Sequence, residues 1–198
     1  MTKFLNKNSC FIGKNVKFGK HVTIYENNHI DGDCYIDDDT VLLPNNFITN
    51  SSIGKNCKVH ASVIEGSKLN DNVSIGPFAR LRPGSEIKDG CKIGNFVEIK
   101  NSSIGEGCKI SHLAYVGDSD IGQNCNIGCG VIFANYNGKG KNKCKIGNHV
   151  FIGSNCNIIA PVTIDDDSFI CAGTTVTENV SKEDFVIGRA RQENKPHR

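Results

Sequence analysis

The chain has no tryptophan, a single methionine and few aromatic residues, which make up 7% of its 198 positions. It also lacks a strong charge of either sign: the formal net charge is only +2, so nothing in it argues for a nucleic-acid surface. No apolar run is long enough to span a bilayer, and residues 1–8 lack the apolar centre of a signal peptide. These absences favour a soluble, cytoplasmic protein that binds neither nucleic acid nor membrane.

Glycine, by contrast, is abundant. The 21 glycines suit a structure with many tight turns and small interior side chains. The length fits one domain that can bury a substantial core.

The clearest pattern is an apolar residue at every sixth position, often followed by glycine or aspartate. It runs from Ile12 to Val176, with a few five-residue steps. A period of six fits neither an α-helix nor an ordinary amphipathic strand, and it is the signature of a hexapeptide β-helix. Three hexapeptides close a triangular coil of about 18 residues, so residues 12–181 predict about nine coils. We therefore expect an all-β, single-domain parallel β-helix over residues 1–182 and a short irregular tail over 183–198.

The ten cysteines follow this repeat. Eight of them stand two residues before a repeat isoleucine or valine, where other repeats carry valine or alanine: Cys10, Cys34, Cys57, Cys91, Cys108, Cys125, Cys144 and Cys156. We expect them to be small buried hydrophobes, because no Cys-x-x-Cys pair indicates a metal site. Free thiols in this number indicate a reducing cytoplasm, and no metal is expected.

Two segments depart from the repeat, and departures are where function is sought. Residues 134–145 form an insertion with four lysines. The insertion is either a solvated loop or an arm that carries positive charge to an anionic substrate, including one on a neighbouring subunit. The basic C-terminus, which includes Arg189 and Lys195, is either simply exposed or contacts the phosphates of a cofactor.

Four polar residues ahead of these segments fall on neighbouring coils. Arg82 and Lys100 are 18 residues apart, so they should stack on one edge of the prism, about one strand spacing apart. Stacked like charges are unfavourable unless an anion lies between them, and a phosphate is the natural candidate. His112 follows Lys100 by 12 residues and Asn126 follows His112 by 14, which places both close by and makes His112 the candidate general base.

Several motifs also resemble those of one family. They are Ile75-Gly-Pro-Phe-Ala-Arg-Leu-Arg-Pro-Gly84, Gly94-Asn-Phe-Val-Glu-Ile-Lys100, His112-Leu-Ala-Tyr115, Asn126-Ile-Gly128, Asn135-Tyr136 and Ala172-Gly-Thr-Thr-Val-Thr177. Together they resemble the C-terminal acetyltransferase domain of the bacterial bifunctional N-acetylglucosamine-1-phosphate uridyltransferase/glucosamine-1-phosphate acetyltransferase. The resemblance implies a left-handed β-helix and a homotrimer with sites between subunits. It also implies acetyl transfer from acetyl-CoA to the amine of glucosamine 1-phosphate, a step in UDP-N-acetylglucosamine biosynthesis.

The resemblance assigns roles to individual residues. His112 is the general base, a task that suits the ordinary pKa of histidine, about 6.5, and Asn126 orients either His112 or the acceptor amine. The sugar phosphate is assigned to Arg82, Lys100, Tyr115, Asn126 and Asn135, with Lys141 donated by the adjacent subunit. Acetyl-CoA is assigned to Cys129, Asn135, Tyr136, Ser154, Ala172, Arg189 and Lys195, with the backbone N–H of Cys129 on the thioester carbonyl. Cys129 stands where the family usually has alanine, and Asn137 where it usually has aspartate.

The chain starts almost directly on repeats, so we expect acetyl transfer without uridyl transfer or a magnesium requirement, and a separate uridyltransferase is a candidate partner. Two alternatives stay open. An N-acetyltransferase for another amino sugar or nucleotide sugar would keep His112 but would not need Arg82 and Lys100. The other alternative is a non-catalytic β-helix that serves as an assembly partner of a separate uridyltransferase, and the intact set of His112, Asn126 and Tyr115 weighs against it. A zinc hydratase of this fold would need three converging histidines, and position 117 is glycine.

Overall fold

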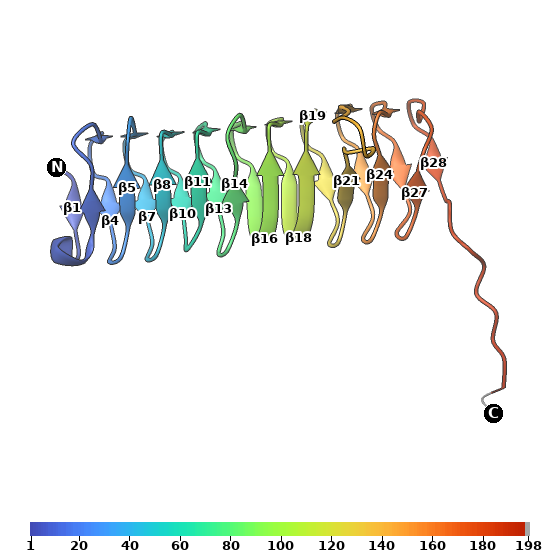
Figure 1. The fold of residues 1–198 in the computed structure, drawn as a ribbon, viewed down its shortest axis with the longest axis horizontal. Coiled ribbons are helices and arrows are strands. Elements are labelled where there is room, and N and C mark those ends of the chain that lie inside the picture. Colours follow the sequence, from blue (N-terminus) through green and yellow to red (C-terminus); the bar gives the residue numbers. More distant parts are fainter. Residues whose placement is uncertain (197–198) are drawn as a thin grey trace.

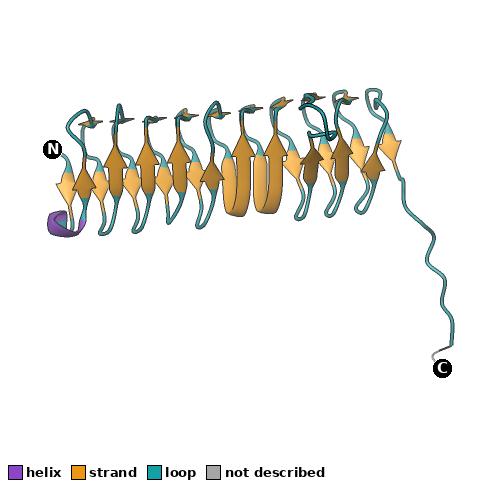
Figure 2. Ribbon diagram, in the orientation of Figure 1, coloured by secondary structure: helices purple, strands orange, loops and turns teal. Residues whose placement is uncertain are grey.

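A computed structural model describes residues 1–196 and shows a parallel β-helix with three flat faces, as predicted (Figures 1 and 2). The only helix in this part of the chain is one 3-10 turn, η1 (Lys7–Ser9), near the N-terminal end. The first face contains β2 (Phe11–Ile12), β5 (His29–Asp31), β8 (Phe47–Thr49), β11 (Val63–Glu65), β14 (Arg80–Leu81), β21 (Ile132–Ala134), β24 (Asn157–Ile159) and β27 (Thr175–Val176). The second face contains β1 (Lys3–Phe4), β4 (Thr23–Ile24), β7 (Val41–Leu42), β10 (Lys58–Val59), β13 (Ser74–Ile75), β20 (Asn126–Ile127), β23 (Phe151–Ile152), β26 (Phe169–Ile170) and β28 (Phe185–Val186).

The third face is a separate nine-stranded sheet. It contains β3 (Lys17–Phe18), β6 (Tyr35–Ile36), β9 (Ser52–Ile53), β12 (Lys68–Leu69), β15 (Glu86–Ile87), β17 (Ser103–Ile104), β19 (Ser119–Ile121), β22 (Cys144–Ile146) and β25 (Thr163–Ile164). The first two faces form a single sheet of 19 strands, because two long strands run round the corner between them. These are β16 (Lys92–Lys100) and β18 (Lys109–Gly117), each of nine residues.

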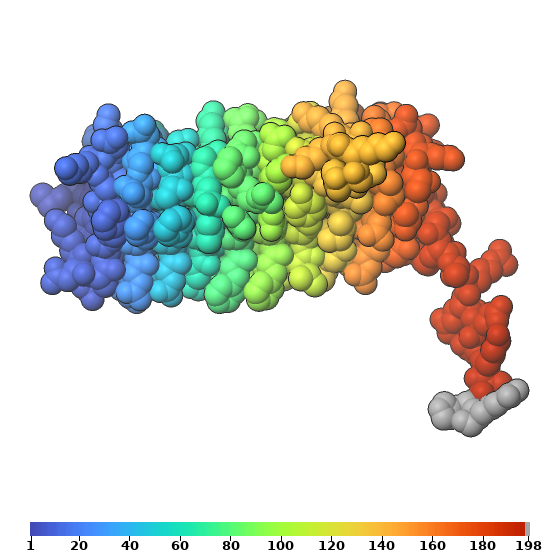
Figure 3. Space-filling model, in the orientation of Figure 1, coloured from blue at the N-terminus to red at the C-terminus, as the bar shows by residue number. Residues whose placement is uncertain are grey.

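The helix has about ten coils, since β16 and β18 each serve two of the three faces. This exceeds the predicted number slightly, because strand pairing begins at Lys3 and continues to Val186. We expected the tail to start at residue 183, and the pairing of β28 with β26 extends the β-helix beyond that point. Beyond β28 the tail projects from the end of the helix (Figures 1 and 3), and its last two residues, 197–198, lie outside the described residues.

The core is a set of vertical stacks of the repeat residues, as the sixfold pattern predicted. Ile93 lies level with Ile110 on the next coil, and Ile110 with Ile127 on the one after. Each of the three is at most 2% exposed. Full burial of such a side chain contributes roughly 1.5–3 kcal/mol, so the stacks supply the main stabilisation of an otherwise loop-rich chain.

The cysteines behave as small core residues. Of the eight in the repeated position, Cys10 is half-buried and the others are buried, and all ten cysteines are free. Burial also raises the pKa of Cys57 to about 11, so this thiol is protonated at neutral pH. The prediction of a packing role is confirmed.

The insertion leaves the helix between β21 and β22, where Tyr136 and Lys141 form an antiparallel bridge. It therefore extends from the corner between the first and third faces and leaves the coils above and below in register. Among the residues that the structure describes, no helix has the length and apolar character needed to cross a membrane.

Candidate active site

His112 lies at the corner between the second and first faces, which we call the histidine corner. It is exposed, and it belongs to β18, whose pairing with β16 continues through the corner and sets His112 level with Asn95. The His112 Nδ1 atom is 2.7 Å from Asn95 Oδ1. If Nδ1 donates to this oxygen, the lone pair of a neutral imidazole is on Nε2, free to accept a proton.

Arg82 and Lys100 meet at the next corner, between the first and third faces, which we call the basic corner. Arg82 lies one coil below Lys100, as the spacing predicted. The backbone N–H of Arg82 donates to the Ile99 carbonyl at 2.8 Å. Each cation has a carboxylate partner: Arg82 pairs with Glu98 at 3.0 Å, and Lys100 pairs with Asp118 at 3.2 Å. The stacked charges are thus compensated within the chain, so their stacking alone does not require a bound phosphate.

Asp118 is the centre of the basic corner, and its side chain is only 11% exposed. Besides Lys100, it accepts hydrogen bonds from Asn101 at 2.6 Å and from Asn135. Burial alone would raise the pKa of Asp118, but the hydrogen bonds from Asn101, Lys100 and Asn135 outweigh it and lower the pKa. Asn135 also donates to the hydroxyl of Tyr115 at 3.4 Å, so Tyr115 joins the basic corner to the middle of the first face.

The inserted loop brings Lys141 of the same chain to the basic corner. The contact with Lys100 lowers the pKa of Lys141, because a second positive charge is disfavoured there. The pKa of Lys100 is raised, first by the same contact with Lys141 and then by the hydrogen bond to Asp118. The resemblance implied a lysine from the adjacent subunit, whereas in this chain Lys141 lies against its own Lys100. Lys143, by contrast, pairs with Asp120 at 2.7 Å and follows the solvated-loop interpretation.

The residues assigned to acetyl-CoA fall into three groups. Above His112 on the histidine corner lie Cys129, Ser154 and Ala172, and Arg189 donates to the Ala172 carbonyl at 2.6 Å. Asn135 and Tyr136 lie at the basic corner, where the loop begins. Lys195, the third, lies at neither corner: it belongs to the C-terminal tail and pairs with Glu193 at 2.9 Å.

Asn126 is not brought to His112. It lies on the second face, level with Lys109 and Phe151. His112 is three residues further along β18 than Lys109, about 10 Å of extended chain. The contact with Nδ1 of His112 is made by Asn95 instead. The expectation that Asn126 orients His112 is therefore not met within one chain, and its other expected role, on the acceptor amine, stays a prediction.

Sequence reasoning missed Asn95, Glu98 and Asp118. Asn95 and Glu98 stand inside a motif that was noted for Lys100, and the 17-residue spacing from Asn95 to His112 is the signal that could have paired them. Asp118 has a positive φ of 49°, at a corner where other coils carry asparagine or glycine. It therefore looks like an ordinary turn residue until its contacts are seen.

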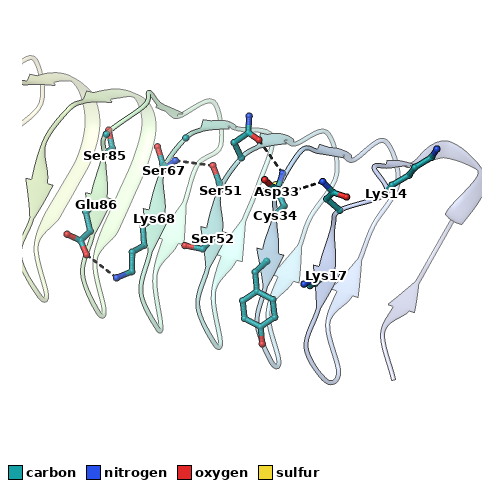
Figure 4. Close-up of a pocket in the computed structure, with 15 residues that line it drawn as sticks. Lys14, Lys17, Asp33, Cys34, Ser51, Ser52, Ser67, Lys68, Ser85 and Glu86 are labelled. Atoms are coloured by element: carbon teal, nitrogen blue, oxygen red, sulfur yellow. Dashed lines mark hydrogen bonds and ion pairs between the residues drawn. The ribbon is translucent and has the colours of Figure 1, made fainter.

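A groove of about 920 Å³ lies closer to the N-terminus, along the third face and the corner between the first and third faces (Figure 4). Its polar side chains satisfy one another: Asn15 donates to Asp33 at 2.9 Å, and Lys68 pairs with Glu86 at 3.3 Å. None of the predicted site residues lines it. Residues 1–196 also contain no group of three or more His, Cys, Asp or Glu side chains that could hold a metal ion.

Comparison with known proteins agrees with the repeat. The family model described as bacterial transferase hexapeptide (six repeats) matches residues 143–178, and that of the GMPPB C-terminal domain matches residues 63–142. The bifunctional protein GlmU of Clostridium beijerinckii is 45% identical over 190 residues, which are 96% of this chain and 42% of that protein. The GlmU of Caldicellulosiruptor saccharolyticus is 48% identical over 187 residues, 94% of this chain and 40% of that protein. The chain thus spans about two fifths of the length of these relatives.

Solved structures support the fold alone. A UDP-N-acetylglucosamine acyltransferase from Bacteroides fragilis superposes with a TM-score of 0.54 at 16% identity, over 87% of this chain and 67% of that one. The Arabidopsis UDP-N-acetylglucosamine acyltransferase gives 0.51 at 20% identity, over 91% of this chain and 67% of that one. The expected resemblance and the left-handed parallel β-helix are confirmed. The chain therefore carries bacterial transferase hexapeptide repeats and is similar, along nearly all of its own length, to part of the bifunctional GlmU proteins.

Proposed function

We propose that this protein transfers the acetyl group of acetyl-CoA to the amine of glucosamine 1-phosphate, giving N-acetylglucosamine 1-phosphate and CoA. The observation that carries the proposal is that one chain has both an exposed histidine, His112, whose Nδ1 is already engaged, and a separate corner where Arg82, Lys100 and Lys141 gather. Three cations against Glu98 and Asp118 leave a net charge of +1 to attract a phosphate. The extensive likeness to bifunctional GlmU proteins supports the same reaction.

In this mechanism Nε2 of His112 takes a proton from the substrate amine as the amine nitrogen attacks the thioester carbonyl carbon. The new C–N bond leaves a negative charge on the carbonyl oxygen. The backbone N–H of Cys129, level with His112 on the next coil, has no backbone acceptor among residues 1–196 and can donate to that oxygen. Collapse of the intermediate breaks the C–S bond, and the CoA thiolate leaves and takes up a proton.

We infer further that the enzyme is a homotrimer in which one copy supplies His112 and another supplies the basic corner. Lys100 lies level with Gly117, five residues from His112, about 16 Å of extended backbone. Its ammonium is held by Asp118, on the far side of Gly117 from His112. The amine and the phosphate of glucosamine 1-phosphate are on adjacent ring carbons, so one molecule cannot bridge the two corners of a single chain. Neighbouring copies can bring different corners together.

The ten free cysteines support a location in the reducing cytoplasm. The test of the reaction is release of CoA thiol from acetyl-CoA, with glucosamine 1-phosphate, glucosamine and glucosamine 6-phosphate compared as acceptors. We expect a clear preference for the 1-phosphate. Equal rates with all three would overturn the substrate assignment, and no release with any amino sugar would overturn the reaction.

A further inference from the structure

Asn95 and His112 meet at an unusual place in the β-helix. In residues 1–196, only β16 and β18 continue as single strands round a corner, and the pairing at that corner sets Asn95 level with His112. Gly94, the residue before Asn95, allows the close approach, because a Cβ there would collide with the Ser111 carbonyl. The two coils that carry the pair are therefore held together through the corner itself.

The backbone beside the pair is also unusual. Phe96 and Leu113, which follow Asn95 and His112, have positive φ values of 58° and 42°. Bulky apolar residues rarely adopt this conformation, and such strain concentrates at functional sites. At the two levels below, Phe78 and Ala61 also have positive φ values, 60° and 43°, whereas other levels of the same corner use Asn27, Asn45 or Gly130. The strained conformation therefore extends over successive levels of this corner, and these include the two coils that present Asn95 and His112 side by side on the outside.

The contact points to one protonation state of a neutral imidazole. A neutral imidazole carries one N–H, and the amide oxygen of Asn95 can only accept, so the proton belongs on Nδ1 when the 2.7 Å contact is made. Nε2 then has the lone pair that a base needs. Neither adjacent level of the corner offers such an oxygen, since the coil below Asn95 has Pro77 and the coil above His112 has Cys129.

We propose that Asn95 is the positioning residue of His112: it holds the ring and keeps the proton on Nδ1, so that Nε2 faces the substrate. The consequence for catalysis rests on the proposed function, whereas the state of the ring does not. A neutral amide holds the ring without stabilising the imidazolium as a carboxylate would. The other titratable groups on the two strands and on the coil above are Lys109 and Tyr115 on β18, Lys92, Glu98 and Lys100 on β16, and Cys129.

The first experiment is nitrogen-15 NMR of the histidine rings in the full-length protein near neutral pH. In the wild type we expect His112 to carry its proton on Nδ1. In Asn95→Ala that preference should be lost, and in Asn95→Asp, which keeps an acceptor oxygen, it should persist. Asn157→Ala serves as the control, because Asn157 is an exposed residue of the same β-helix outside the site. A wild-type His112 protonated on Nε2, or an unchanged ring in Asn95→Ala, would overturn the proposal.

The second experiment measures the acetyl transfer. Asn95→Ala should lower kcat about 10- to 100-fold with little change in KM, as loss of an orienting partner typically does. Asn95→Asp should keep more activity and move the acid limb of the pH–rate profile upward by about one pH unit or more. A kcat in Asn95→Ala equal to that of the wild type would overturn the positioning role. If the wild type shows no acetyl transfer, the proposed function is refuted, and the NMR result alone decides the state of the ring.

Discussion

Replacing Asp118 by asparagine should destabilise the protein far more than the same change at Asp120. Both aspartates pair with a lysine, but the side chains of Asp118 and Lys100 are 11% and 16% exposed, whereas those of Asp120 and Lys143 are 52% and 61% exposed. The carboxylate of Asp118 accepts from Lys100, Asn101 and Asn135. The asparagine amide has only one oxygen, so its NH₂ group would face at least one of these donors. It also carries no charge, so the Lys100 ammonium would lose its counter-charge.

The size of the effect follows from this contrast. Breaking a buried ion pair typically costs about 3–5 kcal/mol, and we expect about 3 kcal/mol for Asp118→Asn because the amide keeps one acceptor. An exposed pair contributes less than about 1 kcal/mol, so the free energy of unfolding of Asp120→Asn should be close to that of the wild type. Equilibrium unfolding in guanidinium chloride, followed by circular dichroism, measures both. Equal losses in the two variants would refute the burial argument.

The same variant has a predictable pH dependence. The pKa of Asp118 is lowered in the folded protein, so its carboxylate contributes stability above its ordinary pKa, near 4, and that contribution is lost as pH falls through the folded value. The difference in stability between wild type and Asp118→Asn should therefore be largest near neutral pH and should shrink below about pH 4. A difference that grows on acidification would contradict the assignment.

Three further outcomes are expected. His112→Ala should lower kcat by about 10²–10⁴ and leave the trimer intact by sedimentation, and a fully active variant would remove His112 as the base. Co-expression of His112→Ala with Lys100→Ala should restore about one quarter of the wild-type activity, because random assembly gives about a quarter of all sites two intact corners. No recovery would mean that each site uses one chain. A thiol reagent should modify Cys129 quickly in the native protein and the buried cysteines only on unfolding, and rapid reaction of many thiols would contradict the packed core.

The fold was predictable because the apolar residues at the repeat positions identify the buried side chains directly from the sequence. Ile93, Ile110 and Ile127 recur at nearly constant spacing, and only a coil of fixed length lets them stack. The number of coils was harder to predict, since the first and last strands, β1 and β28, carry weak or interrupted repeats. Short terminal elements depend on pairing with a neighbour, which the sequence does not show.

The candidate site was predictable only where coil spacing sufficed. The 18-residue step from Arg82 to Lys100 gave their stacking, whereas their partners Glu98 and Asp118 depend on side-chain directions at a corner. Asn126 is 14 residues from His112, three short of the 17-residue step that sets Ile110 level with Ile127, so it lies on the second face and not at the corner above His112. Asn95 was missed because its role appears only when two coils are set in register.

The measurement that tests the central claim most directly is the ratio of kcat/KM for glucosamine 1-phosphate to that for glucosamine, in the wild type and in Lys100→Ala. If the basic corner binds the phosphate, the wild type should favour the 1-phosphate, and Lys100→Ala should lose about 10-fold or more of this preference while its rate with glucosamine changes little. A preference that is absent in the wild type, or unchanged in Lys100→Ala, would contradict the account.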